Sequence, residues 1–209
     1  MRPLASFLGV SAPRSWGAAV CGAVLSSMVL LSATHALADT APRVQFNTSA
    51  GTFMVDLYPD KAPKTVANFL QYVKDKHYDG TIFHRVIENF MVQGGGFDAT
   101  YSEKKTRPPV EHEGQTALAK GGLKNVVGTL AMARTNDPQS ATAQFFINVK
   151  DNTFLDPTPR NFGYTVFGKV VEGMDVVTKI KTTPTGAGGP FPADVPKTPV
   201  VINTAVIVK

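Results

Sequence analysis

The sequence predicts a mainly β protein, built as a closed antiparallel barrel whose ends are covered by helices. Two observations lead to this prediction. Short segments of alternating apolar and polar residues recur along the chain, and only two segments have the apolar spacing of a helix. Many short strands combined with few helices are typical of a small closed barrel.

Eight segments are predicted as strands. The first two, residues 43–48 and 52–58, alternate on either side of Ser49-Ala50-Gly51, which predicts a hairpin. The last, residues 198–208, is largely apolar on both faces, as expected of a strand that is covered on both sides. The other predicted strands are residues 81–87, 90–94, 128–134, 144–148 and 164–170.

Two helices and two loops complete the predicted elements. Pro63 suits the first turn of a helix, whose buried face is formed by residues at i, i+3, i+4 and i+7 spacing: Val66, Phe69, Leu70 and Val73. A shorter helix is predicted over residues 173–181. Residues 97–125 and the Gly/Pro-rich residues 184–196 are predicted as loops. A loop as long as the first is often functional.

The first 38 residues predict a secretory signal peptide. Arg2 and Arg14 give a positive start, an apolar run follows, and Ala36-Leu37-Ala38 matches the A-x-A cleavage pattern. The predicted organisation is therefore a cleaved signal over residues 1–38 and one domain over residues 39–209. The alternative is an uncleaved membrane anchor, because the apolar stretch extends to near spanning length.

Charge and cysteine content restrict the partners of the mature chain. Loss of the two arginines in the signal takes the net charge from +5 to +3. A balance that mild favours neither nucleic acid nor, after signal removal, a membrane as partner. The one cysteine, Cys21, lies in the signal, so the mature chain has no disulfide. Nothing indicates an obligate oligomer, and we expect a monomer.

The sequence lacks the usual equipment for hydrolysis, redox chemistry or phosphoryl transfer. The mature chain has no cysteine nucleophile, no G-x-S-x-G elbow and no phosphate-binding loop followed by a helix. Its three histidines, His77, His84 and His112, lack metal-ligand spacing to another His or Cys. Glu111-His112-Glu113 is interpreted as a solvated loop. We therefore expect no metal and no cofactor.

One dense run carries a specific signature. Residues 83–95 read F-H-R-V-I-E-N-F-M-V-Q-G-G, similar to the cyclophilin signature F-H-R-[VI]-I-x-x-F-M-x-Q-G-G. Residues 128–133, 140–148 and 162–174 match further blocks of that family in the same order, so the resemblance extends from Val44 to the C-terminus. It implies an eight-stranded antiparallel barrel capped by two helices, and peptidyl-prolyl cis/trans isomerase activity on proline-containing polypeptides.

The implied reaction makes and breaks no covalent bond. Rotation about a peptide bond meets a barrier of about 18–20 kcal/mol, and exchange before proline takes tens to hundreds of seconds. A catalyst must bind the twisted peptide, whose nitrogen lone pair is free, better than either planar form. Arg85 is suited to donate a hydrogen bond to that lone pair, because its guanidinium is permanently charged and a rigid planar donor.

The resemblance also assigns the rest of the site. The implied catalytic residues are Arg85, Gln93, Phe90 and Phe146. The implied substrate-binding residues are His84, Met91, Ala133, Arg134, Gln144, Phe154, Leu155 and Tyr164. Within this set the proline ring is received by Phe90, Met91, Phe146 and Leu155. Strand alternation agrees, because it puts Met91 and Gln93 on one face, and likewise Gln144 and Phe146.

Four positions depart from the best-known cyclophilin pattern. Phe154 stands where many members carry tryptophan, Tyr164 where many carry histidine, Arg134 where asparagine is common, and Gly96 where aspartate is common. Without the indole we expect weak or no cyclosporin binding, with isomerisation intact.

These departures, the signal and the sequence from Ala131 to Arg134 resemble the bacterial periplasmic branch, which implies a periplasmic protein that assists the folding of exported proteins. The main alternative is a non-catalytic chaperone that binds proline peptides on the same barrel. Arg85 and Gln93 favour catalysis, because a pure binder does not need the charged donor.

Overall fold

The first hairpin shows how alternation becomes a sheet with one buried face. The computed structural model describes residues 41–208, so the predicted signal lies outside the described residues. Strands β1 (Arg43–Thr48) and β2 (Gly51–Leu57) pair antiparallel, from Arg43 opposite Asp56 to Thr48 opposite Gly51. Their inward side chains Val44, Phe46, Phe53 and Val55 are fully buried or nearly so.

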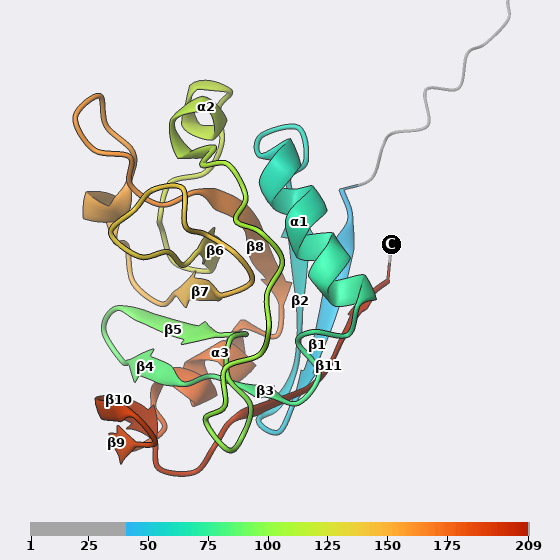
Figure 1. Cartoon of the computed structure of the whole chain (residues 1–209), viewed down its shortest axis with the longest axis vertical. Helices are drawn as coiled ribbons and strands as arrows, with labels where there is room; N and C mark the ends of the chain where they lie inside the picture. The colour runs from blue at the N-terminus through green and yellow to red at the C-terminus, as the bar shows by residue number, and fades with distance from the viewer. Residues whose placement is uncertain (1–40, 209) are drawn as a thin grey trace, which may run out of the picture. The chain divides into compact units, whose positions relative to one another are not determined.

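Nine strands form one strongly curled sheet in the order β3-β11-β1-β2-β8-β6-β7-β5-β4 (Figure 1). The two edge strands follow each other in the chain, with only Phe83 and His84 between them, so the ends of the sheet come close together. The strands not yet given are β3 (Thr81–Ile82), β4 (Arg85–Ile87), β5 (Met91–Gly94), β6 (Thr129–Met132), β7 (Phe145–Asn148), β8 (Val166–Glu172) and β11 (Val201–Ile207).

The mainly β prediction is confirmed, but the closed eight-stranded barrel is not. Within the described chain, β3 and β4 are not paired with each other, and the nine-stranded sheet stays open at this seam. The predicted strand 81–87 is divided because its two halves have different neighbours: β3 pairs with β11, and β4 pairs with β5. Residues 83–84 carry the chain from one pairing to the other.

Three α-helices are described instead of the predicted two. Helix α1 (Pro63–Lys74) starts at the expected proline and buries Val66, Phe69 and Val73, with Leu70 partly buried. Helix α3 (Met174–Lys181) buries Val177 and Ile180. Both predicted loops contain regular structure: α2 (Gly114–Ala119) in the first, and the hairpin of β9 (Thr185–Gly188) and β10 (Phe191–Pro196) in the second. Within residues 41–208 no helix has the length and apolarity to cross a membrane.

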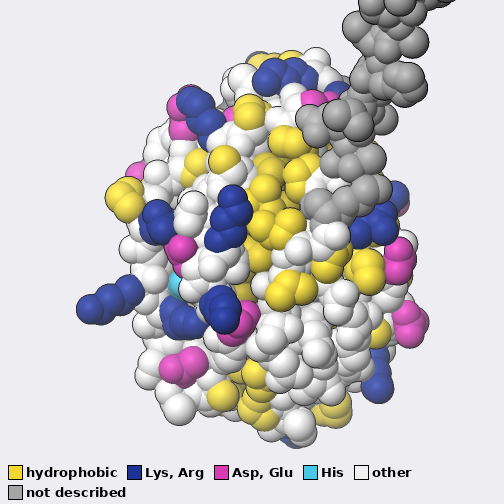
Figure 2. Space-filling view, turned by 90° about the vertical axis from the view of Figure 1, so that its right-hand side faces the viewer, with side chains coloured by type: hydrophobic (Ala, Val, Ile, Leu, Met, Phe, Trp, Pro, Cys, Tyr) yellow, Lys and Arg dark blue, Asp and Glu magenta, His cyan; other side chains and the backbone are white. Residues whose placement is uncertain are grey.

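The prediction that the last strand is covered on both sides is wrong. In β11, Ile202 and Ala205 are buried, whereas Val206 and Ile207 are exposed. Figure 2 views the molecule from the side on which Figure 1 draws the end of β11, and shows apolar side chains gathered among charged ones on this face. The apolar pattern of β11 therefore reflects one packed face and one partly solvated face.

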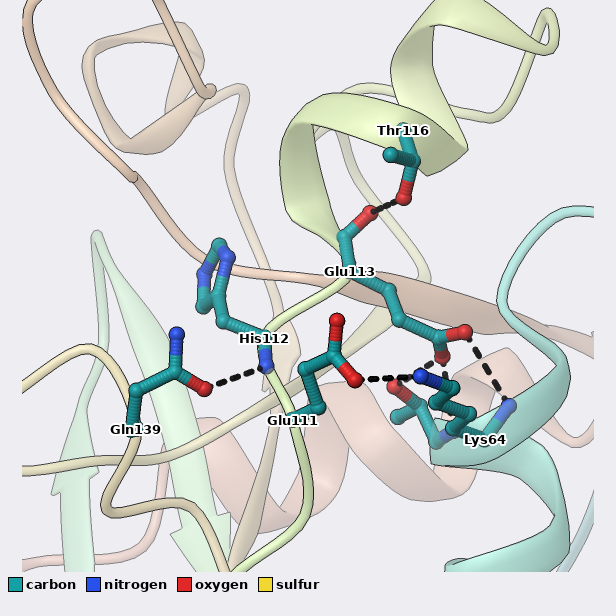
Figure 3. A network of polar contacts seen from close by, with 7 residues as sticks. Lys64, Glu111, His112, Glu113, Thr116 and Gln139 are labelled. Carbon is teal, nitrogen blue, oxygen red and sulfur yellow. Dashed lines mark hydrogen bonds and ion pairs between the residues drawn. The ribbon is translucent and has the colours of Figure 1, made fainter.

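Helix α1 begins beneath a carboxylate supplied by the first predicted loop (Figure 3). Its N-cap residue, Ala62, offers no side-chain acceptor. Instead the carboxylate of Glu113 accepts hydrogen bonds from the backbone N–H of Lys64 at 3.1 Å and of Thr65 at 2.7 Å, and from the Thr65 hydroxyl at 2.7 Å. Because Glu113 is buried, the solvated-loop interpretation is wrong for this residue. A negative charge here satisfies first-turn donors and complements the helix dipole.

Replacing Glu113 with alanine is expected to lower the free energy of unfolding by about 2 kcal/mol, because two helix N–H groups and a buried hydroxyl lose their acceptor. Urea denaturation measures the change. The matched control is Glu111→Ala, which removes an exposed carboxylate paired with Lys64 and is expected to cost under about 0.5 kcal/mol. Equal losses in the two variants would contradict the capping role.

Candidate active site

A hollow of about 280 Å³ lies on the outer side of the sheet, beside β4, β5 and β7. Gln93 of β5 lies opposite Arg85 of β4 on one side and opposite Phe146 of β7 on the other. This register sets an arginine, an amide and an aromatic ring side by side. The hollow is lined by Arg85, Phe90, Met91, Gln93, Ala133, Arg134, Phe146, Leu155 and Tyr164.

The apolar floor of the hollow arises from strand alternation in β7. Phe145 is fully buried in the main core, in contact with the rings of Phe46, Phe69 and Tyr78. Phe146 points to the opposite face and belongs to a separate small cluster with Met91, Ala131 and Val166. Consecutive residues of one strand thus serve two different apolar compartments.

Arg85 borders this apolar surface with a half-exposed guanidinium. Its Nε lies 4.0 Å from Oδ2 of Asp194, which belongs to β10 in the C-terminal hairpin. Asp194 has a left-handed backbone, with φ of 64°, where the register between β9 and β10 shifts. Within residues 41–208 no side-chain hydrogen bond engages the Arg85 terminal amino groups. These N–H donors are therefore available to a ligand in the hollow.

Gln93 is oriented by a second amide. Its Nε2 donates to Oε1 of Gln144 at 3.1 Å. Gln144 in turn occupies space that only a glycine leaves open, because a Cβ at position 96 would lie 2.5 Å from the Gln144 side chain. Gly96, one of the four departures from the common pattern, therefore allows this contact. Gln144 itself lines an adjoining hollow instead of the first one.

Two other departures pack as a pair. Arg134 donates from Nε and Nη2 to the carbonyl oxygen of Gly163, at 3.0 and 2.8 Å. Its guanidinium carbon lies 4.6 Å from the centre of the Tyr164 ring, a cation–π contact. Tyr164 meets Phe146 edge to face at 5.5 Å. The two substitutions thus stabilise each other and form one wall of the hollow.

Besides Gln144, two residues predicted to bind substrate do not line the hollow. His84 is 3% exposed and packs against Phe97 at 4.7 Å and Phe191 at 5.4 Å, outside the hollow. Alternation explains this, because His84 precedes Arg85 and points to the other side of the chain. Phe154 is 70% exposed and stacks on Phe90 at 5.8 Å, in the short 3₁₀ turn Thr153–Leu155. It lies next to the hollow without lining it.

Burial determines the charge of His84. Its pKa is lowered to about 4, chiefly by desolvation; a hydrogen bond with the backbone of Ile82 opposes the shift, and the charge of Arg85 adds to it. Its Nδ1 atom has no hydrogen-bond partner within the described chain. His84 is therefore a neutral, structural ring beneath the hairpin that carries Asp194.

A neutral buried His84 predicts a loss of stability in acid. Above pH 6.5 neither state binds the proton; between pH 6.5 and about 4 the unfolded chain binds it and the folded chain does not. The free energy of unfolding should fall by up to about 1.4 kcal/mol per pH unit in this window and level off below it. Burial also lowers the pKa of His77 and His112, which act in the same direction.

The variant His84→Asn isolates this contribution. Urea denaturation at a series of pH values between 7 and 4 should give a shallower decline for the variant than for the unmodified protein. An unchanged slope would show that protonation of His84 does not destabilise the fold.

Sequence reasoning missed Asp194 and the hairpin that holds it. The segment appears in the sequence as Gly and Pro residues without periodicity, and a left-handed aspartate leaves no pattern there. Its position depends on Phe191, which meets the rings of His84 and Phe97. The only available signal was the aromatic residue in a Gly/Pro-rich segment.

A curled antiparallel sheet with an apolar hollow and an arginine at its edge is suited to binding an apolar ring next to a polar bond. Residues 43–207 match the family model described as cyclophilin type peptidyl-prolyl cis-trans isomerase/CLD. The chain belongs to the cyclophilin family of peptidyl-prolyl cis-trans isomerases, and the predicted activity is confirmed at this level.

Bacterial relatives cover most of the chain. Peptidyl-prolyl cis-trans isomerase cyp18 of Streptomyces antibioticus is 56% identical over 167 residues, 78% of this chain and 97% of the relative. Peptidyl-prolyl cis-trans isomerase A of Dickeya dadantii is 49% identical over 191 residues, 91% of this chain and 97% of the relative. Peptidyl-prolyl cis-trans isomerase B of Escherichia coli is 50% identical over 167 residues, 78% and 98% respectively.

The fold also resembles solved structures. A crystal structure of a Cryptosporidium parvum cyclophilin type peptidyl-prolyl cis-trans isomerase superposes with a TM-score of 0.61 at 24% identity, covering 81% of this chain and 98% of that chain. A second structure of that isomerase, in the presence of the dipeptide Ala-Pro, superposes with a TM-score of 0.60. At this identity the likeness supports the fold alone.

Proposed function

We propose that the chain accelerates rotation about Xaa-Pro bonds by a hydrogen bond from Arg85 to the prolyl nitrogen, while the proline ring occupies the apolar hollow. The observation that carries this proposal is the position of Arg85, which lines the same hollow as Phe146 and Met91 and keeps its terminal amino groups available. The solved relative in the presence of Ala-Pro supports a proline-containing ligand.

The hydrogen bond acts on the twisted peptide. In the planar forms the nitrogen lone pair is delocalised into the carbonyl, and in the twisted form it is localised and accepts a hydrogen bond from an N–H donor. A charge-assisted hydrogen bond contributes about 1.5–3 kcal/mol, roughly ten- to a hundredfold in rate. The remaining acceleration comes from the hollow, whose apolar floor holds the ring still while the preceding carbonyl rotates.

Polar neighbours position the arginine. Asp194 faces Nε and leaves the terminal amino groups for the substrate, and Gln93 lies opposite Arg85 in the sheet. Gln93, held by Gln144, is proposed to contact the rotating carbonyl and to keep Arg85 in place. His84 does not touch substrate. Its ring packs against Phe191 and so helps to hold the hairpin that carries Asp194.

A catalytic and a purely binding protein differ in one measurement. Exchange NMR on a short Ala-Pro peptide reports the cis-to-trans rate at equilibrium, and peptide titration reports binding. We expect rapid exchange with substoichiometric protein. Peptide binding without faster exchange would establish the proline-binding chaperone instead.

The proposed setting is the periplasm, where the mature protein assists folding of exported proteins as a monomer. Support comes from the positive start, the apolar run and the A-x-A pattern before Asp39, and from the absence of cysteine after Cys21. N-terminal sequencing of the protein recovered from a periplasmic fraction tests this setting. A mature chain that begins at Asp39 is the expected result.

Cyclosporin is expected to inhibit this isomerase weakly. Phe154 offers an exposed ring but no indole N–H where many cyclophilins carry tryptophan. The variant Phe154→Trp should strengthen inhibition by about tenfold, the worth of one hydrogen bond, with catalysis of a short peptide unchanged. Inhibition assays on both proteins measure the effect, and tight inhibition of the unmodified protein would contradict the expectation.

A further inference from the structure

Two further hollows continue the active-site hollow across the surface. The second, about 340 Å³, shares Gln93, Ala133 and Arg134 with the first. The third, about 360 Å³, shares Thr106 with the second. Because each hollow shares wall residues with the next, the three lie in a row from the proline site to the end of helix α1, and we call this row the trough.

The far end of the trough is strongly basic. Four cationic side chains, Lys76, Lys104, Lys105 and Arg107, line the third hollow with a single carboxylate, Asp75. Arg107 engages that carboxylate with Nε at 2.9 Å and Nη2 at 2.5 Å. Three ammonium groups remain, and within residues 41–208 none forms an ion pair with a carboxylate. We call this region the basic hollow.

The basic hollow has fixed donors as well as charge. Nζ of Lys104 donates to the carbonyl oxygens of His77 at 2.5 Å and Asp79 at 3.1 Å, which anchors the ammonium group. Tyr72 is 2% exposed, and its hydroxyl accepts from the backbone N–H of Arg107 at 2.8 Å. The hydroxyl proton therefore remains for an acceptor in the hollow.

The backbone around Lys76 also favours the binding of an anion. Lys76 follows α1 with φ of 53°, a left-handed conformation that is unfavourable for a residue with a side chain. Glycine avoids this cost, yet the chain has a lysine here. The last carbonyls of α1, which would repel an anion, already accept hydrogen bonds from the backbone N–H of Asp75, Lys76 and His77.

We propose that the basic hollow binds a carboxylate side chain of the polypeptide whose proline occupies the first hollow, which gives the isomerase a preference for clients with Asp or Glu at a set distance from the proline. The inference rests on the proposed function of the first hollow. The second hollow is lined by one carboxylate, Glu103, and one guanidinium, Arg134, so it has no excess of positive charge, and the preference is expected from the far end of the trough.

The test uses Ala-Pro peptides of about twelve residues in which one Glu is moved through every other position, each compared with the same peptide carrying Gln. At low salt, one window of Glu positions should raise kcat/KM by about three- to tenfold through a lower KM. About 0.5 M NaCl should abolish the gain, because it screens the exposed lysines. Inorganic phosphate should compete more strongly than chloride at equal ionic strength.

Variants separate this inference from the proposed function. Lys76→Gln with Lys105→Gln should remove the preference for Glu and leave turnover of a short Ala-Pro peptide unchanged. The matched control, Lys120→Gln with Lys124→Gln, removes two exposed lysines outside the trough and should keep the preference. Absence of turnover of the short peptide would overturn the proposed function. Normal turnover of the short peptide, together with equal kcat/KM for the Glu and Gln peptides at every position, would overturn the proposed carboxylate site and leave the proposed function standing.

Discussion

Replacing Arg85 with alanine is expected to lower kcat/KM for an Ala-Pro peptide by about 10- to 100-fold, the worth of one charge-assisted hydrogen bond made in the twisted state. Stability should hardly change, because the side chain is half exposed and its ion pair with Asp194 spans 4.0 Å. The peptide should still bind, since Phe146 and Met91 remain. Exchange NMR, peptide titration and urea denaturation on the same samples measure the three quantities.

Two controls sharpen the Arg85 experiment. Arg85→Lys keeps the charge but not the planar donor geometry, and is expected to lose most of the activity. Arg160→Ala removes an exposed arginine outside the hollow and should leave kcat/KM unchanged. If Arg85→Ala retained full activity, catalysis would have to arise from the apolar hollow alone.

Phe145→Ala and Phe146→Ala are expected to have opposite consequences although the residues are adjacent. Phe145 is fully buried among the core rings, so its truncation should lower the free energy of unfolding by about 3–5 kcal/mol. Any protein that stays folded should keep most of its activity. Phe146 borders the hollow, so its truncation should cost less stability and lower kcat/KM at least tenfold.

Measuring both variants by urea denaturation and exchange NMR gives a two-by-two comparison of stability and activity. A separation of the two effects supports the assignment of one ring to the core and the other to the proline site. Equal loss of activity in both variants, measured at a concentration of urea where both are folded, would contradict it.

Sequence patterns predicted those parts of the molecule that depend on local alternation or on a contiguous signature. The hairpin from residue 43 and the helix from Pro63 follow from periodicity, and the structure has both. The signature residues meet in one hollow because Arg85 lies on β4, Met91 and Gln93 lie on its partner strand β5, and Phe90 lies in the short turn between the two strands.

What the sequence did not predict depends on contacts between distant segments. Helix α2 is six residues long, too short for a periodic signal, and Glu113 receives its role from residues 48 and 49 positions away. The break in the strand after Ile82 reflects a change of partner strand, which alternation cannot reveal. The placement of His84 was predictable, because alternation directs its side chain to the side of the chain away from that of Arg85.

The pairing of β11 with β1 and β3 has a consequence for the order in which the protein matures. The last strand of the chain lies between the first strand and the edge of the sheet, and the hairpin just before it seats His84 and supplies Asp194. A growing chain that already contains the whole signature therefore still lacks the partners that hold Arg85 in place. The site is assembled only after residues 201–207 have been synthesised, so until then the prolines of the growing chain isomerise without help from the same molecule.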